Sequence, residues 1–525
     1  MRVLVKGEIC RDRGAGGART RLGLLLFLAC SFPVAARAAG FPDDAAMARE
    51  LRAFVEVHRG APGVVVGLID ARGRRVFRAG ESGRPERPRL DGATRFEIGS
   101  ITKTFTAILL ADMILAGEVS AEQRVGTLFP NTIALTNGVE TATLEALATH
   151  TSGLPRIAVD LPSLARTLSA DPYRGSTVDR VWRSVASVPR SLATPTESPA
   201  YSNLGYALLG RLLERRAGRP YEELLRQRVL EPLGLGSIAT AHTGPPPSEL
   251  AVGHGPGGRP TSYWHIDGYA PAGCLIASAD ELLQYIALNL AAAQPAVAEA
   301  QRLRRTLPGG RGIGLAWMHA EVGGHRLIWH NGATGGFRSF VGFLPDEGRG
   351  FAVLANGQGD VDALARRLLD PAEPPLPGHD ANALVGIALT LILLVWGPLT
   401  LASSIRSAGQ AMRRAAATGP PSPAVPAQPT APSPSPPKVP AIDRLDALRS
   451  PLTPAIALVL AGRLGAWQEV PFALWWGALA ATVMALVFLL RRAGSLPWRR
   501  AGVWRDSGRA LTTALEVTVL ALLFS

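Results

Sequence analysis

Polarity divides this 525-residue chain into parts that cannot share one fold. Residues 39–380 have the mixed composition of a globular domain, whereas residues 22–36 and 383–404 are apolar runs without a single charge. Residues 420–440 contain ten prolines in 21 positions, a composition that builds no core. We therefore expect one folded domain over residues 39–380, set between segments of a different kind.

The distribution of charge argues against nucleic acid as a partner. The chain carries a net charge of +13, but residues 39–380 contain 35 basic and 35 acidic residues. The excess lies at the two apolar ends, with +5 in residues 1–38 and +8 in residues 381–525. Cationic flanks of this kind orient membrane segments, so the partner they indicate is a lipid bilayer.

The N-terminal end has the organisation of a secretory signal peptide over residues 1–38. An arginine-rich start precedes the apolar run, and Ala36-Arg37-Ala38 provides the small residues of a cleavage site. An uncleaved anchor helix is the alternative, although the run is short for one. Leu28-Ala29-Cys30 matches a lipoprotein signal only poorly.

The C-terminal end predicts a multi-pass membrane region. Residues 383–404 are long enough to cross a bilayer as a transmembrane helix, and residues 451–525 contain stretches for three more spans. The proline-rich linker 405–450 carries six basic residues, and residues 491–509 carry six more. Four spans place both basic segments in the cytoplasm and residues 39–380 outside, in the periplasm, on the inner (plasma) membrane.

Within the globular domain the pattern favours an α+β fold. Strand-like segments occur at both ends of the domain, and helical spacing dominates between them. The architecture expected is an antiparallel sheet with flanking helices plus an all-helical lobe. The strands are expected at 64–69, 74–79, 327–329 and 351–355, and the helices at 101–115, 206–216 and 222–230.

The clearest chemical signal is Ser100-Ile101-Thr102-Lys103 at a helix start. Residues three apart share a helix face, so the Ser100 hydroxyl and the Lys103 amine can meet. A serine nucleophile needs a base, and a lysine serves as one when burial lowers its pKa. Lys103 is the only lysine in residues 39–380, beside 34 arginines, which cannot lose their proton. This singles out Lys103 as a functional amine.

Two further motifs are weak when taken alone. Tyr201-Ser202-Asn203 offers a phenol for proton relay and an amide for orienting a substrate, but alone it is more typical of a turn before a helix. His330-Asn331-Gly332, followed by Ala333, offers a hydrogen-bonding side chain and close backbone approach, but alone it is better explained as a histidine at the end of a strand.

Together and in this order, the motifs resemble the serine β-lactamase and penicillin-binding protein family. The similarity covers about residues 50–360 and extends to His150-Thr151-Ser152-Gly153-Leu154 and Pro271-Ala272-Gly273-Cys274-Leu275. The closest pattern is the class C-like branch with its D,D-peptidases and esterases.

The resemblance implies a role for each matching residue. Ser100 would attack a carbonyl and form an acyl-enzyme, and Lys103 and Tyr201 would move its proton. Asn203, His330 and Gly332 would bind substrate, and the N–H groups of Ser100 and Ala333 would form the oxyanion hole. His330 stands where β-lactamases of the family carry lysine, which favours a D,D-peptidase or esterase over a dedicated β-lactamase. No cofactor is implied, and no CxxC or HExxH spacing indicates a metal.

We expect a membrane-tethered serine hydrolase that acts on a D-amino-acid peptide, a β-lactam or a small ester or amide at the cell envelope. One alternative is a sensor that a penicillin-type ligand acylates and that signals through the spans. Another is that the membrane spans carry the function and the hydrolase domain is an appendage, although the spans lack paired buried charges beyond Arg463 and Glu516. Arg338 is either a carboxylate anchor or a surface arginine, and the oligomeric state is left open.

Overall fold

The computed structural model describes residues 40–370, apart from 59–60, 159–170, 193–194, 197, 241–246, 256–257 and 293, and six single residues further on. The signal peptide, the linker and the membrane spans expected from the sequence therefore lie outside the described residues, apart from those six. Within the part that is described, no helix has the length and apolarity needed to span a bilayer.

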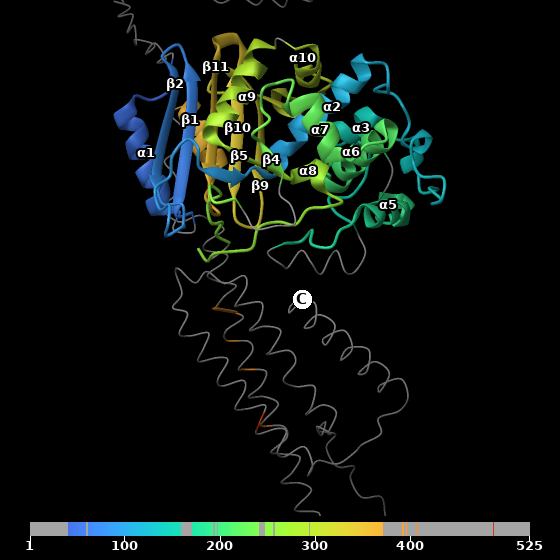
Figure 1. Cartoon of the computed structure of the whole chain (residues 1–525), viewed down its shortest axis with the longest axis horizontal. Helices are drawn as coiled ribbons and strands as arrows, with labels where there is room; N and C mark the ends of the chain where they lie inside the picture. The colour runs from blue at the N-terminus through green and yellow to red at the C-terminus, as the bar shows by residue number, and fades with distance from the viewer. Residues whose placement is uncertain are drawn as a thin grey trace, which may run out of the picture. The chain divides into compact units, whose positions relative to one another are not determined.

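A central sheet of eight strands organises the domain (Figure 1), and every neighbouring pair in it is antiparallel. The N-terminal hairpin pairs with a strand from the other end of the domain, with Val64 opposite Ala355. In spatial order the strands are β2 (Gly73–Gly80), β1 (Gly63–Asp70), β11 (Arg349–Ala355), β10 (Arg338–Leu344), β9 (His325–Ala333), β8 (Met318–Val322), β7 (Arg311–Ile313) and β6 (Arg305–Leu307).

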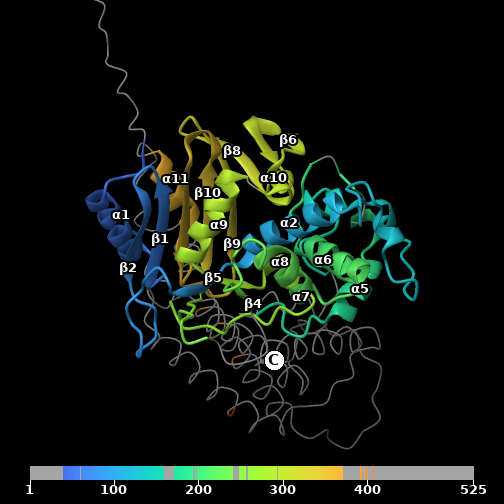
Figure 2. The ribbon, with the colours of Figure 1, turned by 45° about the horizontal axis from the view of Figure 1, so that its top comes forward.

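Both faces of this sheet are covered by helices. Alternate residues of each strand point to opposite faces, so each strand contributes side chains to the packing on both sides. In β1, Val64 and Val66 pack into the core beneath α1 (Asp44–Val57) and α11 (Val361–Leu369). Val65 faces the other way, into the larger core that includes α9 (Ala279–Ala291). Figures 1 and 2 show α1 on one side of the sheet, and α9 with the helical lobe on the other.

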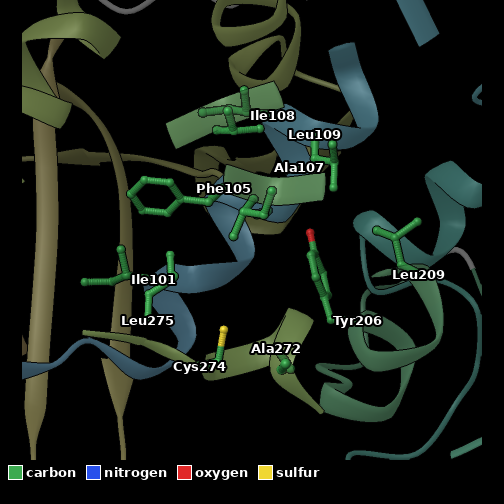
Figure 3. Close-up of a cluster of buried hydrophobic side chains, with 14 of the residues drawn as sticks. Ile101, Phe105, Ala107, Ile108, Leu109, Tyr206, Leu209, Ala272, Cys274 and Leu275 are labelled. Atoms are coloured by element: carbon green, nitrogen blue, oxygen red, sulfur yellow. The ribbon is translucent and has the colours of Figure 1, made fainter. Parts of the chain in front are cut away.

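The helical lobe is built around α2 (Thr102–Leu115), which is buried along most of its length at the centre of the larger core. Figure 3 shows Phe105 and Ile108 of α2 among side chains from the surrounding elements, including Tyr206 and Cys274. The remaining helices of the larger core are α3 (Leu144–Ala148), α5 (Val178–Ser187), α6 (Asn203–Ala217), α7 (Tyr221–Leu225), α8 (Ala270–Gly273) and α10 (Pro295–Gln301).

The α+β class and the antiparallel sheet with helices agree with the expectation, but local details differ. Ser100 lies in a 3-10 turn, η1 (Gly99–Ile101), before α2 begins at Thr102. The helix expected over 222–230 continues beyond α7 as a π-helical turn, η5 (Arg226–Leu230). A second sheet was not expected, because its strands are too short to show periodicity: β3 (Arg95–Glu97), β5 (Leu275–Ser278) and β4 (Ala239–Thr240).

Candidate active site

The turn that carries Ser100 lies against the end of β9. Gly99 has a φ of +49°, and a Cβ built on it would lie 2.9 Å from the Ala333 nitrogen. A Cβ on Gly332 would lie 2.0 Å from the Ile98 carbonyl oxygen. Only glycine fits at both positions, and this close approach brings the Ala333 backbone beside the turn of Ser100. Ser100 and Ala333 are the two residues whose N–H groups the resemblance assigns to the oxyanion hole.

Two side chains converge on the Ser100 hydroxyl. Lys103 Nζ donates to Ser100 Oγ over 2.9 Å from the first turn of α2. Tyr201 Oη donates to the same oxygen over 2.6 Å from the segment before α6. Residues separated by about a hundred positions in the sequence thus meet at one oxygen, the arrangement that an activated serine nucleophile requires.

Lys103 lies in surroundings that disfavour its charged form. Its side chain is fully buried, and its second hydrogen bond is to the Ala272 carbonyl at 2.7 Å. Burial first, and the nearby Arg156 guanidinium second, hold the pKa of Lys103 well below its usual range. Among the described residues no carboxylate pairs with it. A neutral amine at this place has a lone pair that can take the Ser100 proton.

Tyr201 remains a phenol rather than a phenolate. Burial raises its pKa to about 12, although the hydrogen bond with Ser100 opposes the rise. Lys103 Nζ lies 5.0 Å from the centre of the Tyr201 ring. A protonated Tyr201 can pass a proton to and from Ser100 but cannot be the resting base, so the geometry leaves that role to Lys103.

His330 is neutral and buried, with its ring centre 6.5 Å from that of Tyr201. Its Nδ1 lies 2.6 Å from the Asn331 carbonyl, which can only accept, so Nδ1 carries the proton. Burial is the largest cause that lowers the pKa of His330, to about 3. Nε2 therefore keeps its lone pair, and residue 330 brings no positive charge to the site.

Asn203 offers an unused acceptor. It is the first residue of α6, and its Nδ2 donates to Tyr173 Oη over 2.6 Å. Its Oδ1 is buried and has no hydrogen-bond partner within the described part of the chain. A buried unpaired carbonyl is costly, and it belongs to a residue that lines the cavity described below.

These groups open into a cavity of about 540 Å³. Ser100, Tyr201, Asn203, Gly332 and Ala333 line it, whereas Lys103 and His330 are not among the lining residues. The sequence left the role of Arg338 open, and it gave no role to Asn331 and Ala272 although both lie in motifs quoted above. No motif marks the other lining residues, which are Arg156, Ile157, Pro172, Tyr173, Trp264, Ile266, Thr334 and Asp362.

Arg338 belongs to this cavity and is not a surface arginine. Its Nη1 donates to the backbone carbonyls of Thr334 and Phe337 at 2.9 Å each. Burial lowers its pKa, and the Asp362 carboxylate opposes this without forming an ion pair within the described residues. The cavity therefore contains a guanidinium whose charge the protein leaves largely uncompensated.

A buried acid, Glu97, lies directly behind the cavity wall. It is 3% exposed and accepts a hydrogen bond from the Trp264 backbone N–H at 2.8 Å. Burial raises its pKa to about 7, opposed in part by the Thr334 hydroxyl and by that N–H. Its other carboxylate oxygen has no partner among the residues that the structure describes. The sequence placed Glu97 beside the Ser100 motif but gave it no role.

Metal ligands do not gather here. In the described ranges there is no group of three or more His, Cys, Asp or Glu side chains that could hold a metal ion. Cys274 is a buried free thiol, and burial raises its pKa.

Comparison with known proteins places the chain in a family. A family model described as Beta-lactamase matches residues 45–372, so the chain belongs to the β-lactamase family. It is a serine hydrolase of the β-lactamase and D,D-carboxypeptidase kind.

Two curated relatives illustrate the range of the family. Penicillin-binding protein 4 of Amycolatopsis lactamdurans is 26% identical over 285 residues, which are 50% of this chain and 72% of the relative. The D-alanyl-D-alanine-carboxypeptidase/endopeptidase AmpH of Escherichia coli K12 is 33% identical over 183 residues, or 34% of this chain and 44% of AmpH. The alignment thus spans less than half of AmpH.

Solved structures show the same fold. A class C β-lactamase from Rhodobacter sphaeroides aligns with a TM-score of 0.53 at 22% identity, over 62% of this chain and 97% of that chain. A β-lactamase/D-alanine carboxypeptidase from Pseudomonas syringae gives the same TM-score, 0.53, at 22% identity, over 62% and 98% of the two chains. The α+β β-lactamase fold is therefore established for this domain.

Proposed function

We propose that this protein hydrolyses its substrate through an acyl-enzyme on Ser100. The observation that carries the proposal is the pair of hydrogen bonds that Lys103 and Tyr201 make to Ser100 Oγ. The neutral Lys103 amine takes the hydroxyl proton as Oγ attacks the substrate carbonyl. The backbone N–H groups of Ser100 and Ala333 then stabilise the negative oxygen of the tetrahedral intermediate.

The same groups complete the turnover. Lys103 returns the proton through the Tyr201 hydroxyl to the leaving group as the acyl bond to it breaks. A water molecule then attacks the acyl carbon, gives its proton to the Tyr201 and Lys103 pair, and the proton passes back to Ser100 as the acid product leaves. Asn203 lines the cavity and is placed to bind a polar group of the substrate during both steps.

The preferred substrate carries a carboxylate near the scissile bond, as a peptide that ends in a D-amino acid or a β-lactam does. Arg338 supports this, because it lies in the cavity without an ion-pair partner among the described residues. Residue 330 is neutral, so a guanidinium has to recognise such an anion. The curated relative AmpH is a D-alanyl-D-alanine carboxypeptidase by name, which favours the peptide over the β-lactam as natural substrate.

We also propose that the hydrolase domain is tethered to the inner membrane and faces the periplasm. The uncharged run 383–404 and the basic residues of segments 405–450 and 491–509 support this. Protease added to spheroplasts is expected to remove the hydrolase domain and to leave it intact in unbroken cells. Degradation only after the inner membrane is lysed would contradict this orientation.

The test of the mechanism is the intact mass of the detergent-solubilised full chain over time with benzylpenicillin. Wild type is expected to gain one penicillin mass, and Ser100→Ala is expected to gain none. A peptide ending in D-Ala-D-Ala is run beside it, and wild type is expected to release D-alanine from it. Hydrolysis retained in Ser100→Ala would refute the mechanism.

The lifetime of the penicillin adduct distinguishes a peptidase from a β-lactamase and from a penicillin sensor. An adduct that disappears while the drug is consumed indicates a β-lactamase. An adduct that persists on a protein that releases no D-alanine indicates the penicillin sensor. Absence of both adduct and D-alanine would refute the proposed substrate class and direct the search to small esters and amides.

Arg338→Gln tests carboxylate recognition. The KM for a peptide with a free C-terminal carboxylate is expected to rise about 30-fold, the value of one charge-assisted hydrogen bond of about 2 kcal/mol. The same peptide with a C-terminal amide is the matched control and is expected to change little. An equal effect on both peptides would show that Arg338 acts on the fold of the cavity and not on the carboxylate.

A further inference from the structure

His150 lies in a conformation that its residue type rarely adopts. It follows α3 with a φ of +59°, in the left-handed region, and it is 3% exposed. A non-glycine residue in this region costs of order 1 kcal/mol or more, so the surrounding structure has to enforce it. Strain of this kind directs attention to what the residue holds in place.

Both neighbours of Tyr201 in the sequence are hydrogen-bonded by His150. The Ala200 N–H donates to the His150 carbonyl oxygen over 2.8 Å. The Ser202 N–H donates to His150 Nδ1 over 3.1 Å. The left-handed backbone turns the carbonyl and the imidazole of one residue toward the two peptide groups that flank Tyr201.

The imidazole also packs against the tyrosine itself. The ring centres of His150 and Tyr201 are 4.4 Å apart, and those of His150 and Tyr206 are 5.1 Å apart. Tyr201 is therefore fixed by His150 at the residue before it, at the residue after it and on its ring.

The tautomer of His150 follows from these contacts. Nδ1 accepts from a backbone N–H, so the proton of the neutral ring is on Nε2. Burial first, and the nearby Arg156 guanidinium in addition, hold the pKa of His150 well below its usual range. Nδ1 therefore remains an acceptor at the pH values where Lys103 is active.

We propose that His150 is a positioning residue that holds the Tyr201 hydroxyl on Ser100 Oγ. The inference rests on the proposed acyl-enzyme function. His150 does not line the cavity, so its loss is expected to slow acylation with little change in substrate binding. Because proton transfer depends steeply on geometry, a displaced Tyr201 hydroxyl loses a large part of its contribution to the rate.

Two substitutions at residue 150 separate the parts of this role. His150→Asn keeps a side-chain acceptor near the Nδ1 position, and asparagine tolerates the left-handed backbone. His150→Gly keeps only the backbone conformation and its carbonyl. We expect the acylation rate constant of the full chain with benzylpenicillin to fall about 30-fold in His150→Gly and less than 5-fold in His150→Asn, with KM for the peptide within 2-fold in both.

A double-mutant cycle with Tyr201→Phe identifies the pathway of the effect. If His150 acts by placing the Tyr201 hydroxyl, His150→Gly adds nothing further once that hydroxyl is gone. If the role of His150 is purely structural, His150→Gly slows acylation by the same factor in the Tyr201→Phe protein as in wild type. This result would overturn the proposal. Equal losses in His150→Asn and His150→Gly would overturn it as well.

A milder variant keeps the test valid if His150→Gly does not fold. Ala200→Pro removes the N–H that donates to the His150 carbonyl and changes an exposed residue. Its acylation rate constant is expected to fall about 3- to 10-fold, and an unchanged rate would contradict the proposal. If neither probe acylates the wild-type protein, the proposed function is refuted. If wild type is acylated and the variants are acylated at the same rate, only the inference about His150 is refuted.

Discussion

Glu97 gives the domain a stability that depends on pH. In the folded protein the pKa of this carboxyl is raised from the ordinary 4.5 to about 7, mainly by burial and also by the Asp171 charge. The folded state therefore binds more protons than the unfolded state between these values, and stability falls as the pH rises from 4.5 through 7. At 1.4 kcal/mol per pH unit, the loss amounts to about 3 kcal/mol, complete above pH 7.

The substitution Glu97→Gln removes this titration and keeps the contacts. A glutamine resembles the protonated acid, and its carbonyl oxygen can accept from the Trp264 N–H as Glu97 Oε1 does. We therefore expect the variant to equal wild type near pH 4.5 and to exceed it by about 3 kcal/mol at pH 8.

Thermal unfolding of the solubilised full chain between pH 4.5 and pH 8.5 measures the difference. A folded unit of about 330 residues has an unfolding entropy of about 0.7 kcal/mol per kelvin, so 3 kcal/mol corresponds to about 4 °C at pH 8. The difference between variant and wild type is the quantity of interest, because other groups titrate in both. Curves that run parallel across the whole range would show that Glu97 does not carry a raised pKa.

Three further outcomes follow from the site. Lys103→Met is expected to reduce acylation by benzylpenicillin about 100- to 10,000-fold at an unchanged or higher unfolding temperature, and intact mass measures the rate; near-normal acylation would exclude Lys103 as the base. Gly99→Ala is expected to lower both acylation and the unfolding temperature, because its Cβ would lie 2.8 Å from the Ala333 oxygen at a positive φ, and wild-type values for both would contradict the close approach. Cys274 is expected to resist iodoacetamide in the native protein and to react in urea, read on its tryptic peptide, since it is wholly buried; labelling of the folded protein would show that the core opens.

The sequence was informative about the fold where its local pattern was strong. Strand-like composition predicted the segments 64–69 and 74–79, which form β1 and β2, and apolar spacing predicted α2. It gave no warning of the three-stranded sheet, because strands of two to four residues are defined by their partners and not by their own pattern. The π-helical turn after α7 is likewise set by packing.

The sequence motifs likewise predicted part of the candidate active site and missed the rest. Lys103 and Tyr201, which the motifs singled out, each lie within hydrogen-bond distance of Ser100 Oγ in the structure. The burial that lowers the pKa of Lys103 could not be read from spacing, although its status as the only lysine of the domain pointed to an unusual amine. Arg156 reaches the cavity from outside every motif, so only the tertiary structure reveals it.

The pairing of β1 with β11 joins segments from opposite ends of the domain, and this has a consequence for synthesis. The ribosome makes about 5–20 residues per second, so Arg349 follows Asp70 by about 15–60 s. Throughout that time the nascent hairpin has an unpaired inner edge that can recruit other strands. A chain released before residue 349 never covers this edge, so truncated translation products are expected to aggregate rather than to persist as partial domains.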